Sequence, residues 1–430
     1  MFSIKKNWRN WGETASREQA SFYTPQSIED VQNIVIRAKN QNKTIRTVGT
    51  GHSFSPVALP DCYAMELSHM TGLIHVDETL QQATFWAGTR LYDVGPLLAA
   101  SQLALENMGD IDVQTIAGAI STGTHGTGIQ LGSISNQIVR WGVVDGNGTY
   151  RQITREDAYS ESMHISLGLM GVITDVTIQA VPLYGLAYDC SKVTTNTLLS
   201  TFQKTVQTNR HAEWFYFPGQ TDVQQKVMNP IDPMTVQAKP LSKMDIFLEN
   251  NVLQYASSLC KVIPKATKLV SNLSAKAVPI GQREDVSYQL FATPRKVKFV
   301  ECEYAIPIEN FEACFEELHE TLSRHPYAVH FPIEIRTQKG ERGFLSPTQG
   351  EDCVFIAFHM YKGMRYEPYF RYVHYVTSKY GGRAHFGKMN HYDEGDFKRQ
   401  YAKHNIFLAH IEQFDPQGLF RTAFFKRMLK

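Results

Sequence analysis

The chain has 430 residues, enough for about two or three domains with large cores, so a short peptide ligand is excluded. Lysine and arginine total 43 against 42 aspartate and glutamate, and this net charge of +1 argues against nucleic acid as a partner. The six cysteines are spread singly without a C-x-x-C pair, which predicts reduced, mostly buried thiols and neither a disulfide framework nor a zinc ribbon.

Neither an export signal nor a membrane span is indicated. The first twenty residues contain no apolar run of the kind that a secretory signal carries. No window approaches about 18 consecutive apolar residues, the length that a transmembrane helix requires. We therefore expect a cytoplasmic protein without a membrane span. The sequence leaves its oligomeric state open.

Short helical and strand signals alternate through the first part of the chain. A helix is expected to begin after Ser27, its N-cap, with Asp30 at the third helical position. The apolar stripe of this helix is Ile28, Val31, Ile34, Val35 and Ala38. Strands are expected at 44–48, 63–67, 83–87, 137–144, 149–153 and 172–180, with a second helix through 91–98. Glycine-rich turns are expected at 49–53 and 118–128, and the whole pattern is of the α+β class.

The amino-acid composition of the chain changes after Pro182. Glycines become rarer, aromatic residues become more frequent, and the spacing of Ile308, Phe311, Phe315, Leu318 and Leu322 predicts an amphipathic helix. We place a domain boundary there, with one domain at 1–182 and a second at 183–430.

Both glycine-rich turns combine an unhindered backbone with a histidine. They are Gly49-Thr50-Gly51-His52-Ser53 and Gly123-Thr124-His125-Gly126-Thr127-Gly128. Backbone N–H groups in such turns bind anions without lysines, so both loops suit a pyrophosphate. Neither loop has the G-K-[ST] ending of a P-loop or the full G-x-G-x-x-G spacing, which indicates a nucleotide site of another design.

Ordered motifs along the chain resemble a known family. Segments 47–53, 114–128 and 171–174 are similar to the FAD domain of the vanillyl-alcohol-oxidase superfamily, and most of all to its sugar-1,4-lactone oxidases and alditol oxidases. Glu334-Ile335-Arg336 matches the Glu-x-Arg element of that group, His385-Phe386-Gly387-Lys388 resembles its H-W-G-K motif with Phe for Trp, and 415–420 fits its terminal signature. The resemblance implies a two-subdomain FAD-binding domain, followed by an α+β substrate or cap domain with an antiparallel sheet. It also implies that the C-terminal segment returns to the flavin.

The resemblance implies FAD attached covalently through His52, and a neutral imidazole is a competent nucleophile. A single linkage is expected, because no cysteine occurs between Cys62 and Cys190 to form a second one. His125 is assigned to cofactor binding and not to attachment. The predicted cofactor-binding residues are Val48, Gly49, Thr50, Gly51, His52, Ser53, Thr115, Gly118, Ala119, Ser121, Thr122, Thr124, His125, Gly126 and Ile173.

Three residues of the second domain are predicted to be catalytic. Strand alternation places Glu334 and Arg336 on one face. We expect Arg336 and Lys388 to polarise the reacting hydroxyl and to support the anionic flavin. We expect Glu334 to bind a neighbouring hydroxyl and to orient Arg336. These three residues and Ser121 are the predicted substrate contacts. His385, His391 and Asp393 could be spaced as metal ligands, but a metal site is not expected, because there is no H-E-x-x-H motif or paired His/Cys grouping and Lys388 would place a cation between them.

The resemblance implies oxidation of a gulono-, galactono- or arabinono-1,4-lactone, with hydride transfer to flavin N5 and reoxidation by O2 to give H2O2. The motifs do not distinguish this activity from an alditol oxidase that acts on a terminal CH2OH, or from a dehydrogenase that uses another acceptor. A noncatalytic flavin-binding or carbohydrate-binding protein is a further alternative. Phe386, in place of the usual Trp, makes the substrate preference of any relative unsafe to transfer.

Overall fold

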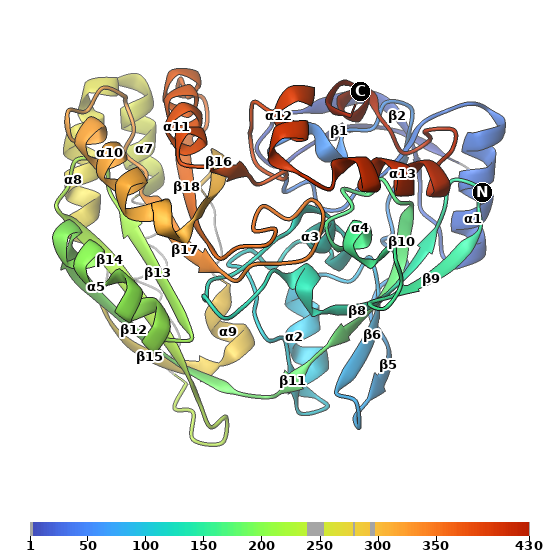
Figure 1. Ribbon diagram of the computed structural model, residues 1–430, viewed down its shortest axis with the longest axis horizontal. Coiled ribbons are helices and arrows are strands. Elements are labelled where there is room, and N and C mark those ends of the chain that lie inside the picture. The colour runs from blue at the N-terminus through green and yellow to red at the C-terminus, as the bar shows by residue number, and fades with distance from the viewer. Residues whose placement is uncertain (1–2, 239–252, 278–279, 293–296, 430) are drawn as a thin grey trace.

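The computed structural model describes residues 3–238, 253–277, 280–292 and 297–429 (Figure 1). A four-stranded sheet comes first in the chain, with the strand order β1-β2-β4-β3. β2, β4 and β3 pair in parallel, whereas β1 pairs with β2 antiparallel. The bounds of these strands are β1 (Ile4–Arg9), β2 (Ser16–Tyr23), β3 (Ile45–Thr47) and β4 (Tyr63–Met65).

The first helix, α1 (Ile28–Asn40), forms as its sequence predicts. The side chain of Ser27 accepts a hydrogen bond from the Asp30 N–H, which satisfies a backbone donor at the start of the helix. The predicted apolar stripe faces inward, since Val31, Ile34, Val35 and Ala38 are all buried.

A second, five-stranded sheet has the order β5-β6-β10-β8-β9 and is antiparallel throughout. Its strands are β5 (Leu73–Asp77), β6 (Gln82–Trp86), β8 (Ile138–Val144), β9 (Tyr150–Thr154) and β10 (Val172–Gln179). A small pair joins β7 (Leu103–Ala104) to β11 (Val181–Pro182). The strands predicted in this part of the chain all form, with slightly displaced ends, whereas β1, β2, β5, β7 and β11 were not predicted.

The stretch 118–128 was expected to be a turn throughout, and this prediction is wrong for its first half. Helix α3 (Ile116–Thr122) occupies it. The Thr115 side chain caps the helix by accepting from the Gly118 N–H, and the apolar Ile116, Ala119 and Ile120 are buried beneath it. The turn begins only at Gly123, whose left-handed φ of 77° ends the helix.

An eight-stranded antiparallel sheet dominates the second half of the chain, in the order β15-β12-β14-β13-β17-β18-β16-β19. This confirms the antiparallel sheet that the sequence led us to expect. Its strands are β12 (Gly185–Thr194), β13 (His211–Tyr216), β14 (Asp222–Ile231), β15 (Gly281–Val286), β16 (Phe299–Pro307), β17 (Ile333–Gln338), β18 (Cys353–Tyr361) and β19 (Arg383–Ala384).

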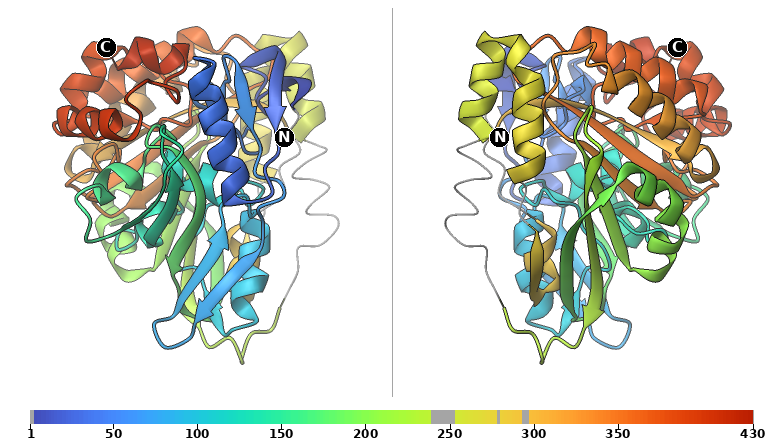
Figure 2. Two further views of the ribbon diagram at one scale, coloured as in Figure 1. Left: turned by 90° about the vertical axis from the view of Figure 1, so that its right-hand side faces the viewer. Right: turned by 90° about the vertical axis from the view of Figure 1, so that its left-hand side faces the viewer.

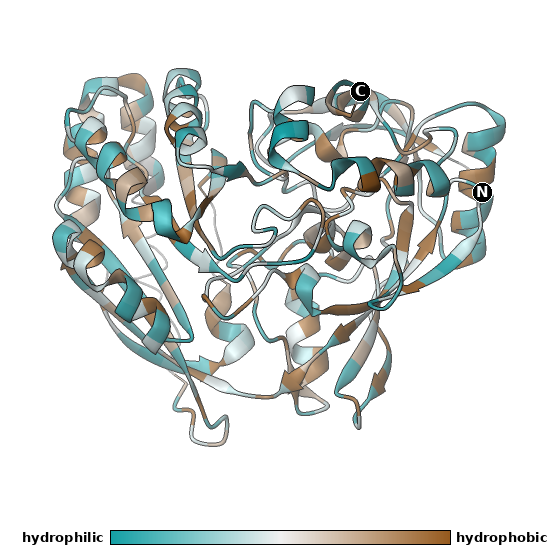
Figure 3. Cartoon of the chain, viewed as in Figure 1, coloured by the Kyte–Doolittle hydropathy of each residue, from teal (hydrophilic) through white to brown (hydrophobic). Residues whose placement is uncertain are grey.

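Helices line the outer side of this sheet, and the loops of the first half of the chain face its inner side (Figures 1 and 2). The predicted amphipathic helix is one of them, α10 (Phe311–Ser323), with Phe311, Phe315, Leu318 and Leu322 buried. Figure 3 shows hydrophilic and hydrophobic stretches alternating along these helices, as expected of helices packed on one face. Because both sides of the sheet are covered, every residue of β16 and β17 is buried.

The remaining helices and short helical turns have the following bounds. The α-helices are α2 (Leu91–Ala99), α4 (Ser160–His164), α5 (Thr195–Thr208), α7 (Leu253–Val262), α8 (Thr267–Ala277), α9 (Ser287–Phe291) and α11 (Glu367–Lys379). The 3₁₀ turns are η1 (Pro56–Ala58), η2 (Ile134–Gln137), η4 (Pro264–Ala266) and η5 (Ile308–Asn310). None of the helices in the described ranges is long and apolar enough to cross a membrane.

The C-terminal helices lie against the first half of the chain (Figure 1). They are α12 (Glu394–Gln400), α13 (His404–Phe414) and α14 (Ala423–Met428). The Ile45 N–H donates to the Leu419 carbonyl at 2.8 Å, and the Gly146 N–H donates to the Phe414 carbonyl at 2.7 Å. The division into domains at residue 182 stays a prediction. All six cysteines are free thiols, and five of them are buried.

Candidate active site

A cavity of about 850 Å³ lies among the loop after β3, the start of α3 and the segment before β10. Six glycines line it, which lets the backbone form most of its wall: Gly49, Gly51, Gly88, Gly118, Gly168 and Gly171. Most of the predicted cofactor-binding residues line it too, namely Val48, Gly49, Thr50, Gly51, His52, Ser53, Thr115, Gly118, Ser121, Thr122 and Ile173. The structure therefore brings the two loops together around one space.

The chemistry of this wall fits an anionic dinucleotide such as FAD. None of the described residues that line the cavity is a carboxylate. Arg46 lines it and is buried, and its guanidinium lies 4.7 Å from the centre of the Phe425 ring and donates to the Gly168 carbonyl. Burial lowers the pKa of Arg46 to about 9. A Cβ on Gly49 would come within 2.8 Å of Thr115 Oγ1, so a side chain at this position would narrow the cavity.

His52 stands where the first cavity meets a second one, because it lines both. Its ring stacks on Trp11 with the ring centres 5.4 Å apart. Burial, together with the charges of Lys388 and Arg90, lowers the pKa of His52 to about 4. The imidazole is therefore neutral at neutral pH and keeps a lone pair for nucleophilic attack.

The second cavity has a volume of about 500 Å³ and also shares Ser53, Gln114 and Thr122 with the first. Its other polar lining residues are Thr124 and a set of charged groups and histidines: Asp110, His125, Glu303, Arg336, His385 and Lys388. The two cations predicted to be catalytic thus lie in one cavity, next to the space that fits the cofactor.

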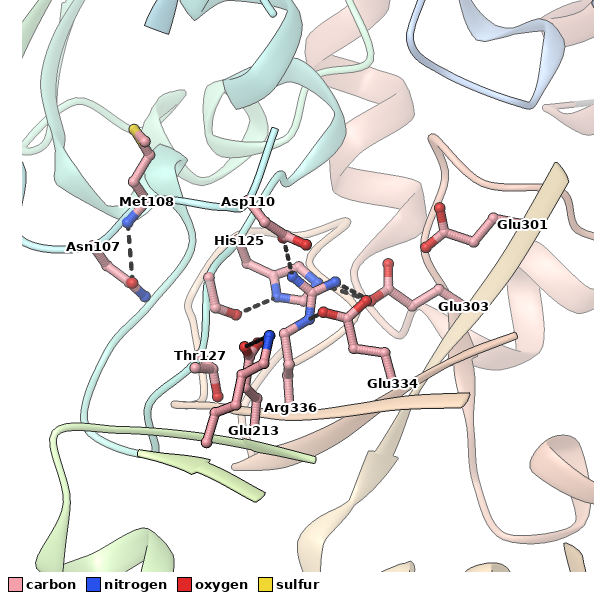
Figure 4. Close-up of polar contacts among 12 residues, drawn as sticks. Asn107, Met108, Asp110, His125, Thr127, Glu213, Glu301, Glu303, Glu334 and Arg336 are labelled. Carbon is pink, nitrogen blue, oxygen red and sulfur yellow. Dashed lines mark hydrogen bonds and ion pairs between the residues drawn. The ribbon is translucent and has the colours of Figure 1, made fainter. Parts of the chain in front are cut away.

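Arg336 is held by three carboxylates, as Figure 4 shows. Its Nη1 donates to Asp110 at 3.0 Å, its Nη2 donates to Glu303 at 3.2 Å, and its Nε lies 3.5 Å from Glu334 Oε1. The last contact confirms that strand alternation places Glu334 and Arg336 on one face of β17. Glu334 is buried and is not among the described residues that line either cavity. Its position fits an orienting role for Arg336, and its predicted contact with a substrate hydroxyl stays a prediction.

Lys388 is positioned by the loop that carries His52. The Phe54 N–H donates to the Gly387 carbonyl at 2.7 Å, which ties the segment after β19 to that loop. Lys388 Nζ lies 2.6 Å from Glu301 and 3.8 Å from Glu303. Burial favours the neutral amine, but these two carboxylates outweigh it and raise the pKa of Lys388. The side chain is therefore a fixed cation at the cavity wall.

The carboxylates of β16 were missed by the sequence analysis. Glu301 and Glu303 alternate with Cys302, so both side chains project from the same face of the strand toward the cations. Burial raises the pKa of a carboxyl, but the charges of Lys388 and Arg336 hold the pKa of Glu303 well below its usual range. Two acidic residues inside an otherwise apolar strand were the signal in the sequence, because such residues are seldom buried without partners.

His125 and Thr124 both line the second cavity, and neither lines the glycine-lined first cavity. Two other predicted cofactor residues also lie outside the first cavity. Gly126 lines a third cavity, which Arg336 lines as well, and Ala119 is fully buried within α3. The His125 loop is bonded to the strand that carries Arg336, because the Gly128 N–H donates to the Thr337 carbonyl at 2.8 Å.

His125, Glu303 and His385 are the one group of three among the described residues that offers atoms close enough to hold a metal ion, within 4.8 Å of one another. Their hydrogen bonds argue against this use. His385 Nδ1 accepts from the Gly387 N–H at 3.0 Å, so its other nitrogen carries the proton and has no lone pair for a metal. Arg336 and Lys388 already neutralise Glu303 and would repel a metal cation.

Comparison with known proteins agrees with this geometry. Residues 176–428 match the family model described as D-arabinono-1,4-lactone oxidase, and residues 20–154 match that of an FAD binding domain. An L-gulono-1,4-lactone dehydrogenase of Mycobacterium tuberculosis is 31% identical, with 98% of this chain and 99% of that protein aligned. The L-gulonolactone oxidase of Mus musculus is 26% identical, with 98% of each chain aligned. The solved structure of cholesterol oxidase from B. sterolicum superposes with a TM-score of 0.86 at 16% identity, over 100% of this chain and 97% of that one, which shows a shared fold.

Proposed function

The chain belongs to the D-arabinono-1,4-lactone oxidase family of FAD-binding oxidoreductases, and from this premise we propose that it oxidises an aldono-1,4-lactone at a CH–OH carbon. The observation that carries the proposal is the junction of the two cavities at His52, Ser53, Gln114 and Thr122. One cavity fits an anionic dinucleotide, and the other places two cations and several hydrogen-bonding groups around a space for a small polyhydroxy molecule.

The chain offers residues for both the cofactor and the substrate in this reaction. FAD, when bound, accepts the hydride from the substrate carbon. Arg336 and Lys388 stabilise the negative charge that develops on the substrate oxygen, and they favour a negative charge on the reduced cofactor. Glu301, Glu303 and Asp110 hold the two cations in place before the substrate arrives, so little reorganisation is needed during the reaction. In this proposal, 1–182 binds the cofactor and 183–430 supplies the cations.

We further propose that FAD is attached covalently through His52 by a single bond. The neutral imidazole and its place between the two cavities support this role. The test is acid precipitation of the purified protein, followed by measurement of the flavin absorbance of the pellet. Flavin is expected to stay with the wild type and with His75→Ala, an exposed histidine of β5, and to be released from His52→Ala. Flavin released from the wild type would refute the covalent link.

The substrate and the electron acceptor require separate assays. A lactone substrate is favoured, because the two relatives named above by sequence similarity are lactone enzymes. The M. tuberculosis relative is a dehydrogenase, however, and the M. musculus relative is an oxidase. We propose O2 as the acceptor, which predicts H2O2 formation in step with lactone consumption. Turnover with an artificial dye and no H2O2 would support the dehydrogenase alternative. Turnover of alditols without turnover of lactones would support the alditol oxidase alternative.

A further inference from the structure

Oxidation of a hydroxyl releases a proton as well as a hydride, and the two cations of the second cavity are poor acceptors for it. We propose that His125 is the catalytic base, that it takes the hydroxyl proton at Nε2, and that Glu303 is the positioning residue that stabilises the resulting imidazolium. This inference rests on the proposed function and adds to it a proton acceptor from the first half of the chain.

The hydrogen bonds of His125 leave one nitrogen available. Its Nδ1 lies 2.9 Å from the Gly126 carbonyl, which can only accept, so Nδ1 carries the proton. In the neutral ring, Nε2 then has a free lone pair. The ring is packed against Phe355, with ring centres 3.8 Å apart, which holds it in one orientation. A preorganised lone pair in a buried, cation-lined cavity is what a general base requires.

The lone pair faces a carboxylate. His125 Nε2 lies 3.4 Å from Glu303 Oε1, and both side chains are almost fully buried. Two unprotonated acceptors at this distance repel each other, and a proton placed on Nε2 turns the repulsion into a charge-assisted hydrogen bond. The pair is therefore built to gain one proton. Figure 4 shows His125 and Glu303 facing each other beside Arg336.

His52 and His385 also line the cavity. His52 is proposed to carry the cofactor, and His385 is less suited to the role of base. Its Nδ1 lone pair is occupied by the Gly387 N–H, and burial, with the nearby cations, lowers its pKa to about 3. Such a ring is too weak a base to take a proton at neutral pH. Of the described residues that line the second cavity, His125 is the histidine that combines a nitrogen without a hydrogen-bond donor on it and an adjacent carboxylate.

The O–H bond of the substrate breaks and its proton goes to His125 Nε2. The electron pair of that bond forms the second bond of the new carbonyl, while the C–H bond breaks and its hydride leaves with both electrons to the oxidised flavin. The substrate loses two electrons and the flavin gains them. Arg336 and Lys388 stabilise the oxygen during the step, and the imidazolium remains paired with Glu303.

The test compares His125→Gln and Glu303→Gln with the control His164→Gln. His164 is also buried and its Nε2 lies 3.1 Å from the buried carboxylate of Glu341, but it is not among the described residues that line the cavity. In anaerobic single-turnover reduction of the flavin by lactone, we expect His125→Gln to slow the rate by roughly 10²–10⁴-fold. Glu303→Gln should slow it by roughly 10–100-fold, and His164→Gln should match the wild type.

A second readout does not depend on activity. Nitrogen NMR of labelled histidines in the cofactor-free protein should show His125 with its proton on Nδ1, and Glu303→Gln should move protonation of that ring to lower pH. The charged or titratable groups around the ring are Asp110, Glu301, Glu303, Arg336, His385 and Lys388, and none of the others is altered in this variant. Protonation of His125 unchanged in Glu303→Gln would overturn the pairing.

The role of His125 as the base and the proposed function of the protein can be refuted separately. Wild-type flavin that is reduced by lactone, together with an equal rate in His125→Gln, would refute His125 as the base and leave the proposed function intact. Wild-type flavin that no lactone or alditol reduces would refute the proposed function, and the NMR titration would still decide whether His125 and Glu303 are coupled.

Discussion

Replacement of Lys388 by methionine is the sharpest single perturbation of this site. Methionine keeps the length of the apolar stem and removes the ammonium that lies 2.6 Å from Glu301 and 3.8 Å from Glu303. At an effective dielectric constant of about 20, charges at these distances attract with about 6 and 4 kcal/mol, which are upper bounds on the loss. Removing one partner of a buried ion pair typically costs about 3–5 kcal/mol of folding stability. We expect the free energy of unfolding to fall by about 3 kcal/mol, because the carboxylates relieve part of the cost by taking up a proton.

The catalytic effect of Lys388→Met should be larger than its effect on binding. Loss of one group that stabilises a developing oxyanion lowers kcat by about 10²–10³-fold. The assay is steady-state turnover of the preferred lactone by protein that retains its yellow colour, with denaturant unfolding measured in parallel. The control is Lys298→Met, which removes an exposed lysine paired with Glu13 and should leave kcat unchanged. A kcat for Lys388→Met within about threefold of wild type would refute the role of this cation.

Three further predictions concern other parts of the molecule. Gly126→Ala should lower stability by about 1–3 kcal/mol and slow turnover, because a Cβ there would lie 2.3 Å from the Met108 carbonyl; thermal melting and single-turnover reduction measure both. Arg46→Met should weaken FAD binding measured in the His52→Ala background, because it removes the buried cation of the first cavity and its bond to Gly168; an unchanged Kd would contradict this role. The cofactor-free protein should lose stability as the pH falls from about 6.5 to about 4, because burial lowers the pKa of His211 and of His330 to about 4 and the unfolded chain therefore binds more protons in that window. Replacing His330 by Gln should flatten part of this dependence in melting curves taken across the same pH range.

The fold of the first half of the chain was largely predictable, because its signals are local. The Ser27 cap and the apolar stripe of α1 depend only on residues within a few turns of one another. The error at 118–128 has a local cause as well. Gly118 suggested a turn, but one glycine inside a helix costs only about 1 kcal/mol, and the Thr115 cap and the burial of Ile116 and Ile120 outweigh that cost.

The site was only partly predictable, because its charges are paired across the chain. Arg336 and Lys388 were identified through motifs, and the structure brings both into one cavity. The partners that hold them, Asp110, Glu301 and Glu303, belong to no motif, and their use depends on contacts between residues far apart in the sequence. The alternation of Glu301 and Glu303 in an apolar strand was the one local sign of their role.

The central claim is that this chain uses flavin to oxidise an aldonolactone, and anaerobic reduction of the bound flavin tests it most directly. Purified protein would be mixed without oxygen with gulono-, galactono- and arabinono-1,4-lactone in turn, and with alditols of the same carbon number. We expect at least one lactone to bleach the visible flavin absorbance within the time of a turnover, with the alditols slower. Bound flavin that stays oxidised with every lactone would contradict the account.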